Sequence, residues 1–327
     1  MSPGARLSAM MLVAAASVLS SGGVFAARSA YREIVQARDR GDLEDVGGGG
    51  SDARSALPAG ARVLRDVAYG SDPAQKFDVY VPAGAKAAAV IFMVHGGGWT
   101  RGDKGMARVV DEKVRRWLPR RFIFITTNYR MVPAVSVETE ARDLAAAVAF
   151  AQRHAREWGG DARKFVLMGH SAGAHLVALL DSAPTIATKA GAAPWLGSVL
   201  LDSGALDVTA IMRDRHFALY DRAFGQDPAQ WKAVSPLAQL AQRGAPILAI
   251  CSARRANSCD QAQAYVDKAV SFGTRASVRR ENRSHGEINA DLGKPGPYTD
   301  AVETFLRSLG LSIGDDSAAP AGGAQRP

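Results

Sequence analysis

The residues with the clearest chemical potential form Gly169-His170-Ser171-Ala172-Gly173, a Gly-x-Ser-x-Gly sequence. The apolar run 165–168 precedes it, and an alanine- and leucine-rich helical pattern follows directly. A strand that turns sharply into a helix holds a serine at the tip of the turn, where the hydroxyl is accessible. Glycines suit this turn because larger side chains would strike the neighbouring strand and helix. We therefore predict that Ser171 is a nucleophile.

A second glycine-rich sequence, His95-Gly96-Gly97-Gly98-Trp99, follows the apolar run 89–94. Consecutive glycines allow backbone N–H groups to converge on one point and allow a carbonyl oxygen to approach them closely. The N–H groups of Gly97, Gly98 and Ala172 would then form an oxyanion hole. Such a site stabilises the negatively charged intermediate of acyl transfer.

With both motifs in this order, the sequence resembles the α/β-hydrolase fold over about residues 63–309. The similarity is to esterases and lipases with an HGGG loop, which include hormone-sensitive-lipase-like carboxylesterases and kynurenine-formamidase-like enzymes. It implies a mostly parallel sheet flanked by helices and a triad in the chain order serine, acid, histidine. The implied reaction is hydrolysis of a carboxylic ester, or alternatively a formamide, through an acyl-enzyme without a metal or a cofactor.

The remaining sequence alternates short apolar runs with amphipathic segments, as an α/β fold requires. The expected strands are 63–69, 77–81, 89–94, 122–127, 166–168, 199–201, 247–251 and 276–280, and the expected helices include 106–118, 137–158 and 299–309. Both glycine motifs follow a strand, at the carboxyl end where open α/β sheets place their sites.

The general base is inferred by elimination among six histidines, because the implied chain order places it after the acid. His285 follows the last expected strand, where the resemblance implies the histidine, and we predict it as the base. The other five are placed elsewhere: His95 and His154 precede the serine, His170 faces away inside its motif, His175 lies one helical turn further, and His216 falls in the irregular region 206–236.

The acid is expected after the strand 247–251, where Asp260 is the only carboxylate of the following loop. We predict Asp260 as the acid, although an acidic residue is also favoured in the first turn of a helix. Asn257 is the alternative, since an amide can orient a histidine. Asp202 and Asp207, which follow the preceding strand, are more distant candidates.

Two cysteines, Cys251 and Cys259, flank the same loop. In an exported protein, cysteines at the two ends of a short loop indicate a disulfide, whereas a reducing compartment would leave two free thiols. Closing so short a loop would shape the loop more than it would stabilise the whole fold.

Residues 206–236 are predicted to form a small cap insertion that covers the site. Its aromatic residues Phe217 and Tyr220, together with Trp99 and His170, are candidates for the substrate pocket. They indicate a small or aromatic substrate. The alternative is that the cap aromatics fill a small core of their own.

The two ends of the chain differ in composition from residues 60–311, the predicted catalytic domain. Residues 1–26 combine an arginine, a short apolar core and small residues, which indicates a signal peptide. The core is shorter than the roughly 20 apolar residues of a membrane anchor. Residues 27–59 read as a flexible segment and linker, and residues 312–327 as a disordered tail. The mature protein is predicted to be periplasmic or secreted, without a stable membrane anchor.

The net charge of +8 raises the question of a nucleic-acid partner. The basic residues are spread through the expected helices without an aromatic-basic repeat, so we expect a solvated basic surface and no nucleic-acid binding. The expected partner is a small ester or amide substrate, and the pattern indicates no oligomeric state. A catalytically weak, hydrolase-like binding protein remains an alternative, because the acid departs from the usual pattern.

Overall fold

The structure is a computed structural model that describes residues 57–314. The predicted signal peptide, residues 1–26, lies outside the described residues, as do most of the segment 27–59 and most of the tail 312–327. Within the described residues, no helix combines the length and the apolar character that crossing a bilayer requires. The described residues cover the whole of the predicted catalytic domain, 60–311.

Eight strands form one sheet in the described part of the chain: β1 (Arg62–Ala68), β2 (Lys76–Val81), β3 (Ala88–Val94), β4 (Ile123–Thr127), β5 (Gly160–His170), β6 (Gly197–Leu201), β7 (Ile247–Ser252) and β8 (Ala276–Glu281). Their order in the sheet is β1-β2-β4-β3-β5-β6-β7-β8. β1 and β2 are antiparallel to their neighbours, and the other six strands run parallel. Because parallel strands end at one edge of a sheet, the loops after β3, β5, β6, β7 and β8 gather there.

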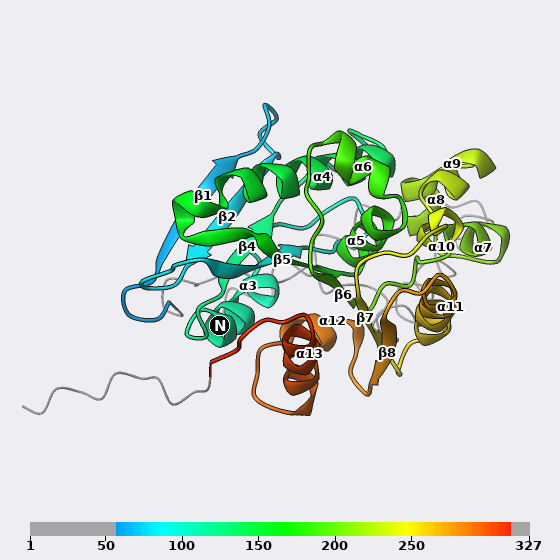
Figure 1. Ribbon diagram of the computed structural model, residues 1–327. Helices are drawn as coiled ribbons and strands as arrows, with labels where there is room; N and C mark the ends of the chain where they lie inside the picture. The colour runs from blue at the N-terminus through cyan, green and yellow to red at the C-terminus, as the bar shows by residue number, and fades with distance from the viewer. Residues whose placement is uncertain (1–56, 315–327) are drawn as a thin grey trace, which may run out of the picture. The chain divides into compact units, whose positions relative to one another are not determined.

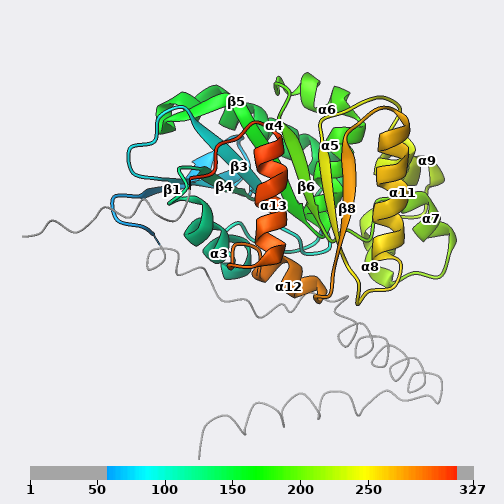
Figure 2. The ribbon, with the colours of Figure 1, turned by 60° about the horizontal axis from the view of Figure 1, so that its bottom comes forward.

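Helices cover both faces of this sheet (Figures 1 and 2). One face carries α4 (Val137–His154), α5 (Ala172–Ser182), α6 (Pro184–Lys189) and α11 (Ser258–Ser271). The other carries α3 (Ala107–Trp117), α12 (His285–Ala290) and α13 (Pro297–Ser308). The short 3-10 helix η2 (Ala155–Trp158) extends α4. The result is the three-layer arrangement that the sequence pattern predicts.

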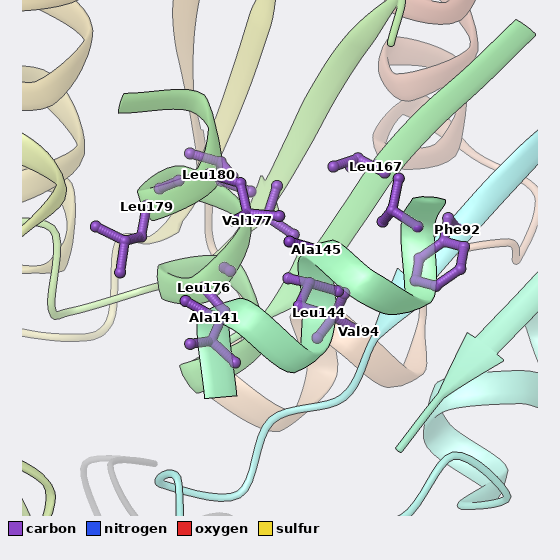
Figure 3. Close-up of a cluster of buried hydrophobic side chains, with 14 of the residues drawn as sticks. Phe92, Val94, Ala141, Leu144, Ala145, Leu167, Leu176, Val177, Leu179 and Leu180 are labelled. Carbon is purple, nitrogen blue, oxygen red and sulfur yellow. The ribbon is translucent and has the colours of Figure 1, made fainter. Parts of the chain in front are cut away.

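The alternation of side chains along the central strands explains why the core has two halves. In β5, Phe165 and Leu167 pack toward α4 and α5, whereas Val166 and Met168 pack toward α3 and α13. Successive residues of a strand point to opposite faces, so a strand buried on both sides must be apolar throughout. Figure 3 shows the first half, where side chains of β3 and β5 meet those of α4 and α5.

Helix α5 is buried along its whole length, from Ala172 to Ser182. A helix that is apolar on every side is a buried helix, which accounts for the alanine- and leucine-rich sequence after the serine. Burial on all sides fixes the start of α5 firmly against the sheet. Ser171 immediately precedes that start.

All the expected strands are present, most of them within one or two residues of the expected bounds. β5 begins at Gly160 instead of residue 166, and the expected helix 137–158 is divided into α4 and η2. The region 206–236, expected to be irregular, contains three short helices, and a fourth begins at its last residue. These are α7 (Val208–Arg213), α8 (Ala218–Phe224), α9 (Pro228–Ala233) and α10 (Pro236–Gln239).

Candidate active site

Ser171 lies at the sharp turn between β5 and α5, with the unusual backbone angles φ 54° and ψ −118°. The two glycines of the motif are required by contact distances. A Cβ on Gly169 would lie 2.4 Å from the carbonyl oxygen of Gly173, and a Cβ on Gly173 would lie 2.4 Å from that of Val94. A positive φ costs a non-glycine residue free energy, and such strain concentrates at functional sites. The structure thus has the turn that the Gly-x-Ser-x-Gly sequence predicts.

The surroundings of Ser171 suit a nucleophile that acts on a carbonyl group. Ser171 is only partly buried, and it directly precedes the N-terminus of α5, where backbone N–H groups and the helix dipole favour negative charge. Its own N–H donates to the carbonyl oxygen of Leu201 at 2.9 Å, which ties the turn to β6. Within the described residues, neither the Ser171 hydroxyl nor the N–H of Ala172 makes a hydrogen bond.

The glycine loop after β3 adopts backbone angles that favour glycine. Gly97 and Gly98 have φ values of 125° and 60°. A Cβ on Gly97 would lie 1.8 Å from the carbonyl oxygen of Arg101, so any larger residue would deform the loop. Among residues 57–314, the N–H groups of Gly97 and Gly98 have no hydrogen-bond acceptor. They remain available as donors, as an oxyanion hole needs.

Trp99 connects the glycine loop to the rest of the site. Its indole N–H donates to Nδ1 of His175 at 3.1 Å, and the other ring nitrogen of His175 donates to the carbonyl oxygen of Val234 at 2.7 Å. Burial lowers the pKa of His175 to about 4, so this ring is neutral and can accept at Nδ1. The chain of contacts fastens the loop to α5 and to the segment before α10.

His285 is the first residue of α12, whose start is fixed by its neighbours. The Ser284 hydroxyl accepts the N–H of Glu287, and the Glu287 carboxylate accepts the N–H of Ser284. This reciprocal capping box holds the helix start in place. The ring of His170, the residue before the candidate nucleophile, lies 4.5 Å from that of His285, and its Nε2 donates to the His285 carbonyl oxygen at 3.0 Å. His285 is therefore packed beside the turn that carries Ser171.

The acidic partner of His285 is Asp202, and the prediction of Asp260 is wrong. Nδ1 of His285 donates to Oδ2 of Asp202 at 2.7 Å, and Asp202 is 1% exposed at the carboxyl end of β6. Asp260 is exposed in the first turn of α11, the position that was its alternative interpretation. Asn257, the other candidate, is exposed as the residue before α11. The order Ser171, Asp202, His285 still follows the chain order that the resemblance implies.

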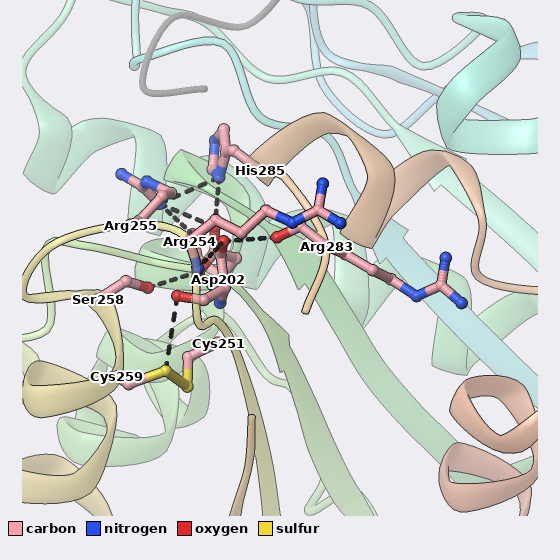
Figure 4. The surroundings of a disulfide bond; sticks show 9 residues. Asp202, Cys251, Arg254, Arg255, Ser258, Cys259, Arg283 and His285 are labelled. Atoms are coloured by element: carbon pink, nitrogen blue, oxygen red, sulfur yellow. Dashed lines mark hydrogen bonds and ion pairs between the residues drawn. A yellow bond between two sulfur atoms is a disulfide. The ribbon is translucent and has the colours of Figure 1, made fainter. Parts of the chain in front are cut away.

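Asp202 accepts hydrogen bonds on both carboxylate oxygens (Figure 4). Oδ1 accepts hydrogen bonds from the N–H of Ser252 at 2.7 Å and from the hydroxyl of Ser258. Oδ2 accepts one from the Nη1 group of Arg255 at 2.9 Å, in addition to the one from His285. Burial opposes the negative charge, but the hydrogen bond from His285 and the charges of His285 and Arg255 hold the pKa of Asp202 well below its usual value. Asp202 is ionised at neutral pH, so His285 carries its proton on Nδ1 and offers Nε2 as an acceptor.

The basicity of His285 is altered by its surroundings. Burial, followed by the positive charge of Arg255 and the contact with His170, lowers its pKa to about 4. The hydrogen bond to Asp202 and the negative charge of Asp202 act in the opposite direction. His285 is consequently neutral, and competent as a base, well below neutral pH.

A disulfide joins Cys251 at the end of β7 to Cys259 in α11, as the cysteine spacing predicts. The bridge closes the loop that supplies Ser252, Arg255 and Ser258 to Asp202 (Figure 4). The loop that was predicted to supply the acid instead donates hydrogen bonds to an acid, Asp202, that follows the neighbouring strand β6.

Helix α8 of the cap packs against the glycine loop. A Cβ on Gly98 would lie 2.6 Å from a terminal methyl group of Leu219 in α8, and a Cβ on Gly204 would lie 3.5 Å from the Tyr220 hydroxyl. Tyr220 is half-buried, and Phe217, which precedes α8, is 37% exposed. Both remain candidates for a substrate contact.

The other two pocket candidates serve different roles. Trp99 is 3% exposed and packs edge-on against Phe224 of the cap, with ring centroids 4.8 Å apart. His170 is 1% exposed against His285. So little accessible surface leaves scarcely any contact area for a substrate, and both side chains position neighbouring residues instead.

The remaining histidines lie in other contacts, as the elimination argument expects. His216 approaches Asp221 in the cap at 3.2 Å, His154 approaches Glu157 at 2.7 Å, and His95 stacks on Tyr129. Among residues 57–314, no group of three or more His, Cys, Asp or Glu side chains is arranged to hold a metal ion.

The BD-FAE family matches residues 77–192. This range includes the glycine loop and Ser171 but ends before Asp202 and His285. The chain is 32% identical over 117 residues to a probable isoprenylcysteine alpha-carbonyl methylesterase of Arabidopsis thaliana. The aligned residues cover 36% of this chain and 24% of that protein. It is 25% identical over 268 residues to Esterase LipC of Mycobacterium tuberculosis, covering 75% of this chain and 65% of that protein.

Solved structures show the same fold. Esterase B of Lactobacillus rhamnosis superimposes with a TM-score of 0.64 at 18% identity, over 86% of this chain and 92% of that one. Thermogutta terrifontis esterase 2, described as phosphoramylated by tabun, superimposes with a TM-score of 0.60 at 22% identity, over 77% and 96% of the two chains. The expected α/β-hydrolase fold is confirmed, and the sequence relatives are esterases.

Proposed function

From the α/β-hydrolase fold of this chain and its similarity to esterases, we propose that it is a serine hydrolase. It cleaves carboxylic esters of small or aromatic substrates through an acyl-enzyme. The observation that supports this most strongly is the 2.7 Å hydrogen bond between Asp202 and His285, packed beside the strained turn of Ser171. A buried carboxylate that orients a histidine next to a serine is the arrangement that activates a hydroxyl nucleophile.

The reaction follows from the donors and acceptors of the site. Nε2 of His285 takes the proton of the Ser171 hydroxyl as Oγ attacks the ester carbonyl. The N–H groups of Gly97, Gly98 and Ala172 stabilise the resulting oxyanion. His285 then protonates the leaving alkoxide. His285 then takes a proton from the attacking water and returns it to Oγ of Ser171 as the acyl–oxygen bond breaks, which releases the carboxylic acid and free Ser171.

The choice of substrate rests on the cap and on the relatives. Leu219 lies within contact distance of Gly98, and the Tyr220 ring lies 6.0 Å from the Trp99 ring, so the cap places an aliphatic and an aromatic side chain beside the glycine loop. The Arabidopsis relative is named a methylesterase and the Mycobacterium relative an esterase. These features favour ester over formamide hydrolysis, and a higher kcat/KM on N-formylkynurenine than on any ester would reverse that choice.

We also propose that the protein is exported to the periplasm or secreted. The disulfide between Cys251 and Cys259 supports this location, because such bonds persist in oxidising compartments. Fractionation of cells that express the full chain tests the proposal. Full-length protein that remains in the cytoplasm with two free thiols would contradict it.

The test of the activity combines labelling with a substrate panel. A fluorophosphonate probe should label the wild-type protein, because only an activated serine reacts readily, and Ser171→Ala should abolish the labelling. On p-nitrophenyl esters of graded chain length, Ser171→Ala should lower kcat by roughly 10³-fold or more. A wild-type protein that folds, resists the probe and hydrolyses no ester would instead be a hydrolase-like binding protein.

A further inference from the structure

The loop closed by the disulfide surrounds one buried carboxylate. Three of the four groups that donate to Asp202 come from residues between Cys251 and Cys259, namely Ser252, Arg255 and Ser258 (Figure 4). The fourth donor is His285. Asp202 is therefore held mainly by the loop that follows the neighbouring strand β7. Of its four donors, His285 is the one that gains or loses a proton in the usual pH range.

Arg255 differs from the other donors because it carries a permanent positive charge. Its side chain is 9% exposed, and that of Asp202 is fully buried. Nη1 lies 2.9 Å from Oδ2 of Asp202, 3.3 Å from the Asp202 carbonyl oxygen and 3.0 Å from Nδ1 of His285. A guanidinium does not lose its proton at any pH at which proteins remain folded. Both Arg255 and His285 thus point a proton at the same oxygen.

This arrangement has two physical consequences. The contacts of Arg255 with the side chain and the backbone of Asp202 fix the direction of the carboxylate, as charge-assisted hydrogen bonds do. The same positive charge opposes the charge that His285 gains when it takes a proton, because two cations would then stand 3.0 Å apart. The carboxylate supports His285 as in an ordinary triad, but part of its charge is already balanced.

We propose that Arg255 is a positioning residue that holds Asp202 against His285 and keeps His285 neutral in acidic solution. The enzyme then retains its base at pH values at which an ordinary histidine is protonated. This inference rests on the proposed esterase function. The charged and titratable groups that face His285 are Asp202, Arg255 and His170, and burial together with Arg255 and His170 lowers the pKa of His285 against the effect of Asp202.

The experiment compares variants that separate charge from geometry. Arg255→Gln removes the charge but keeps a donor, and Arg255→Lys keeps the charge but cannot reproduce the planar fork. Arg254→Gln is the matched control, because Arg254 lies in the same loop and is half-exposed between Asn282 and Glu287. For each protein, kcat and KM for an uncharged phenyl ester are measured from about pH 3.5 to 9. His285 is titrated independently by NMR of histidine-labelled protein.

In the wild type, His285 should titrate well below the usual value of about 6.5. Arg255→Gln should raise that pKa, and the acid limb of kcat/KM with it, by about one unit or more. Arg255→Lys should keep the acid limb near the wild-type position with a lower kcat, and Arg254→Gln should change neither. Equal acid limbs and equal His285 titrations in wild type and Arg255→Gln would overturn the proposal.

Two further outcomes remain decisive. If Arg255→Gln does not fold, the wild-type titration decides, because a His285 that titrates near its ordinary value contradicts the proposal by itself. If the wild type hydrolyses no ester, the proposed function fails. The NMR titrations of wild type and Arg255→Gln still show whether Arg255 controls the protonation of His285, so the two failures can be told apart.

Discussion

At the scale of single residues, the candidate site depends on Asp202, which is buried directly after β6 and accepts the Nδ1 proton of His285. Ser171 and His285 were identifiable because one lies in a local turn sequence and the other follows the last strand. The acid depends on which strand end reaches the histidine, and that is set by packing across the sheet. β6 and β7 are both buried along their whole length, so the sequence does not show which of the two strand ends carries the acid. The only signal for Asp202 was an aspartate directly after a buried strand.

The two aspartates give a direct test of this correction. Asp202→Asn should leave the fold intact and lower kcat by about 10³- to 10⁴-fold, because an amide cannot stabilise the imidazolium and can favour the wrong tautomer of His285. Asp260→Asn is the control and should remain near the wild-type kcat, since Asp260 is exposed in α11. Steady-state kinetics near pH 7 measure both. A mild effect of Asp202→Asn together with a severe effect of Asp260→Asn would show that Asp260, and not Asp202, supports His285.

At the scale of elements, the sequence predicts the strands and the two site loops well. Runs such as 89–94 are buried on both faces, and glycines at Gly97 and Gly173 are required by close backbone contacts. The role of Trp99 was not predictable in the same way. An aromatic residue beside a glycine loop can face a substrate or a packed interior, and only the packing of the indole against Phe224 of the cap and His175 of α5 decides between these positions.

The glycine loop should tolerate substitution unequally. Gly97→Ala should lower kcat by about 10²- to 10³-fold with less effect on KM, because the new methyl group would collide with the Arg101 carbonyl and turn an oxyanion donor away. Gly98→Ala meets only the flexible end of Leu219 and should lose less kcat despite its positive φ. Gly105→Ala, in the same segment, is the control. Equal losses in Gly97→Ala and Gly105→Ala, or an effect confined to KM, would contradict the assigned role.

Glu140 in α4 supports the segment next to this loop. The N–H of Val132 donates both to the carbonyl oxygen of Trp99 at 3.0 Å and to Oε1 of Glu140 at 3.1 Å. Burial raises the pKa of Glu140 to about 9, so the side chain is neutral in the folded protein at pH 7 and ionised in the unfolded chain. Its contribution to stability is complete below about pH 4.5 and is lost as the pH rises toward 9.

Glu140→Gln should therefore change the stability in a pH-dependent way. Relative to the wild type, its free energy of unfolding should be similar at pH 4.5 and higher by about 1 kcal/mol or more at pH 8.5, because the unfolded wild type gains by ionising. Glu138→Gln, on the same helix and paired with Arg142, is the control and should show no such change. Urea unfolding at the two pH values measures it. A difference between Glu140→Gln and wild type that is constant with pH would show that Glu140 is ionised in the folded protein.

At the scale of the whole molecule, the site is assembled from the ends of adjacent parallel strands. β5, β6 and β7 lie side by side and lead to Ser171, Asp202 and the disulfide loop, and β8 leads to His285. The fold class follows from the sequence because the alternation of strands and helices repeats throughout residues 60–311. The register between β6 and β7, which pairs Leu201 with Ile250 and lets the Asp202 carboxylate accept the N–H of Ser252, arises only when the sheet forms.

The disulfide should affect activity more than it affects global stability. It closes a loop between residues only eight apart, so removing it should cost about 2 to 3 kcal/mol or less of a free energy of unfolding shared by the whole domain. The same loop carries Arg255 and two serines that hold Asp202, so its release should lower kcat at temperatures far below the unfolding midpoint. We expect this of the double variant Cys251→Ala/Cys259→Ala. Kinetics at 25 °C and thermal unfolding measure the two effects separately, and intact mass with and without alkylation verifies the bridge in the wild type. An unchanged kcat with a lowered Tm would show that the loop keeps its place through its hydrogen bonds alone.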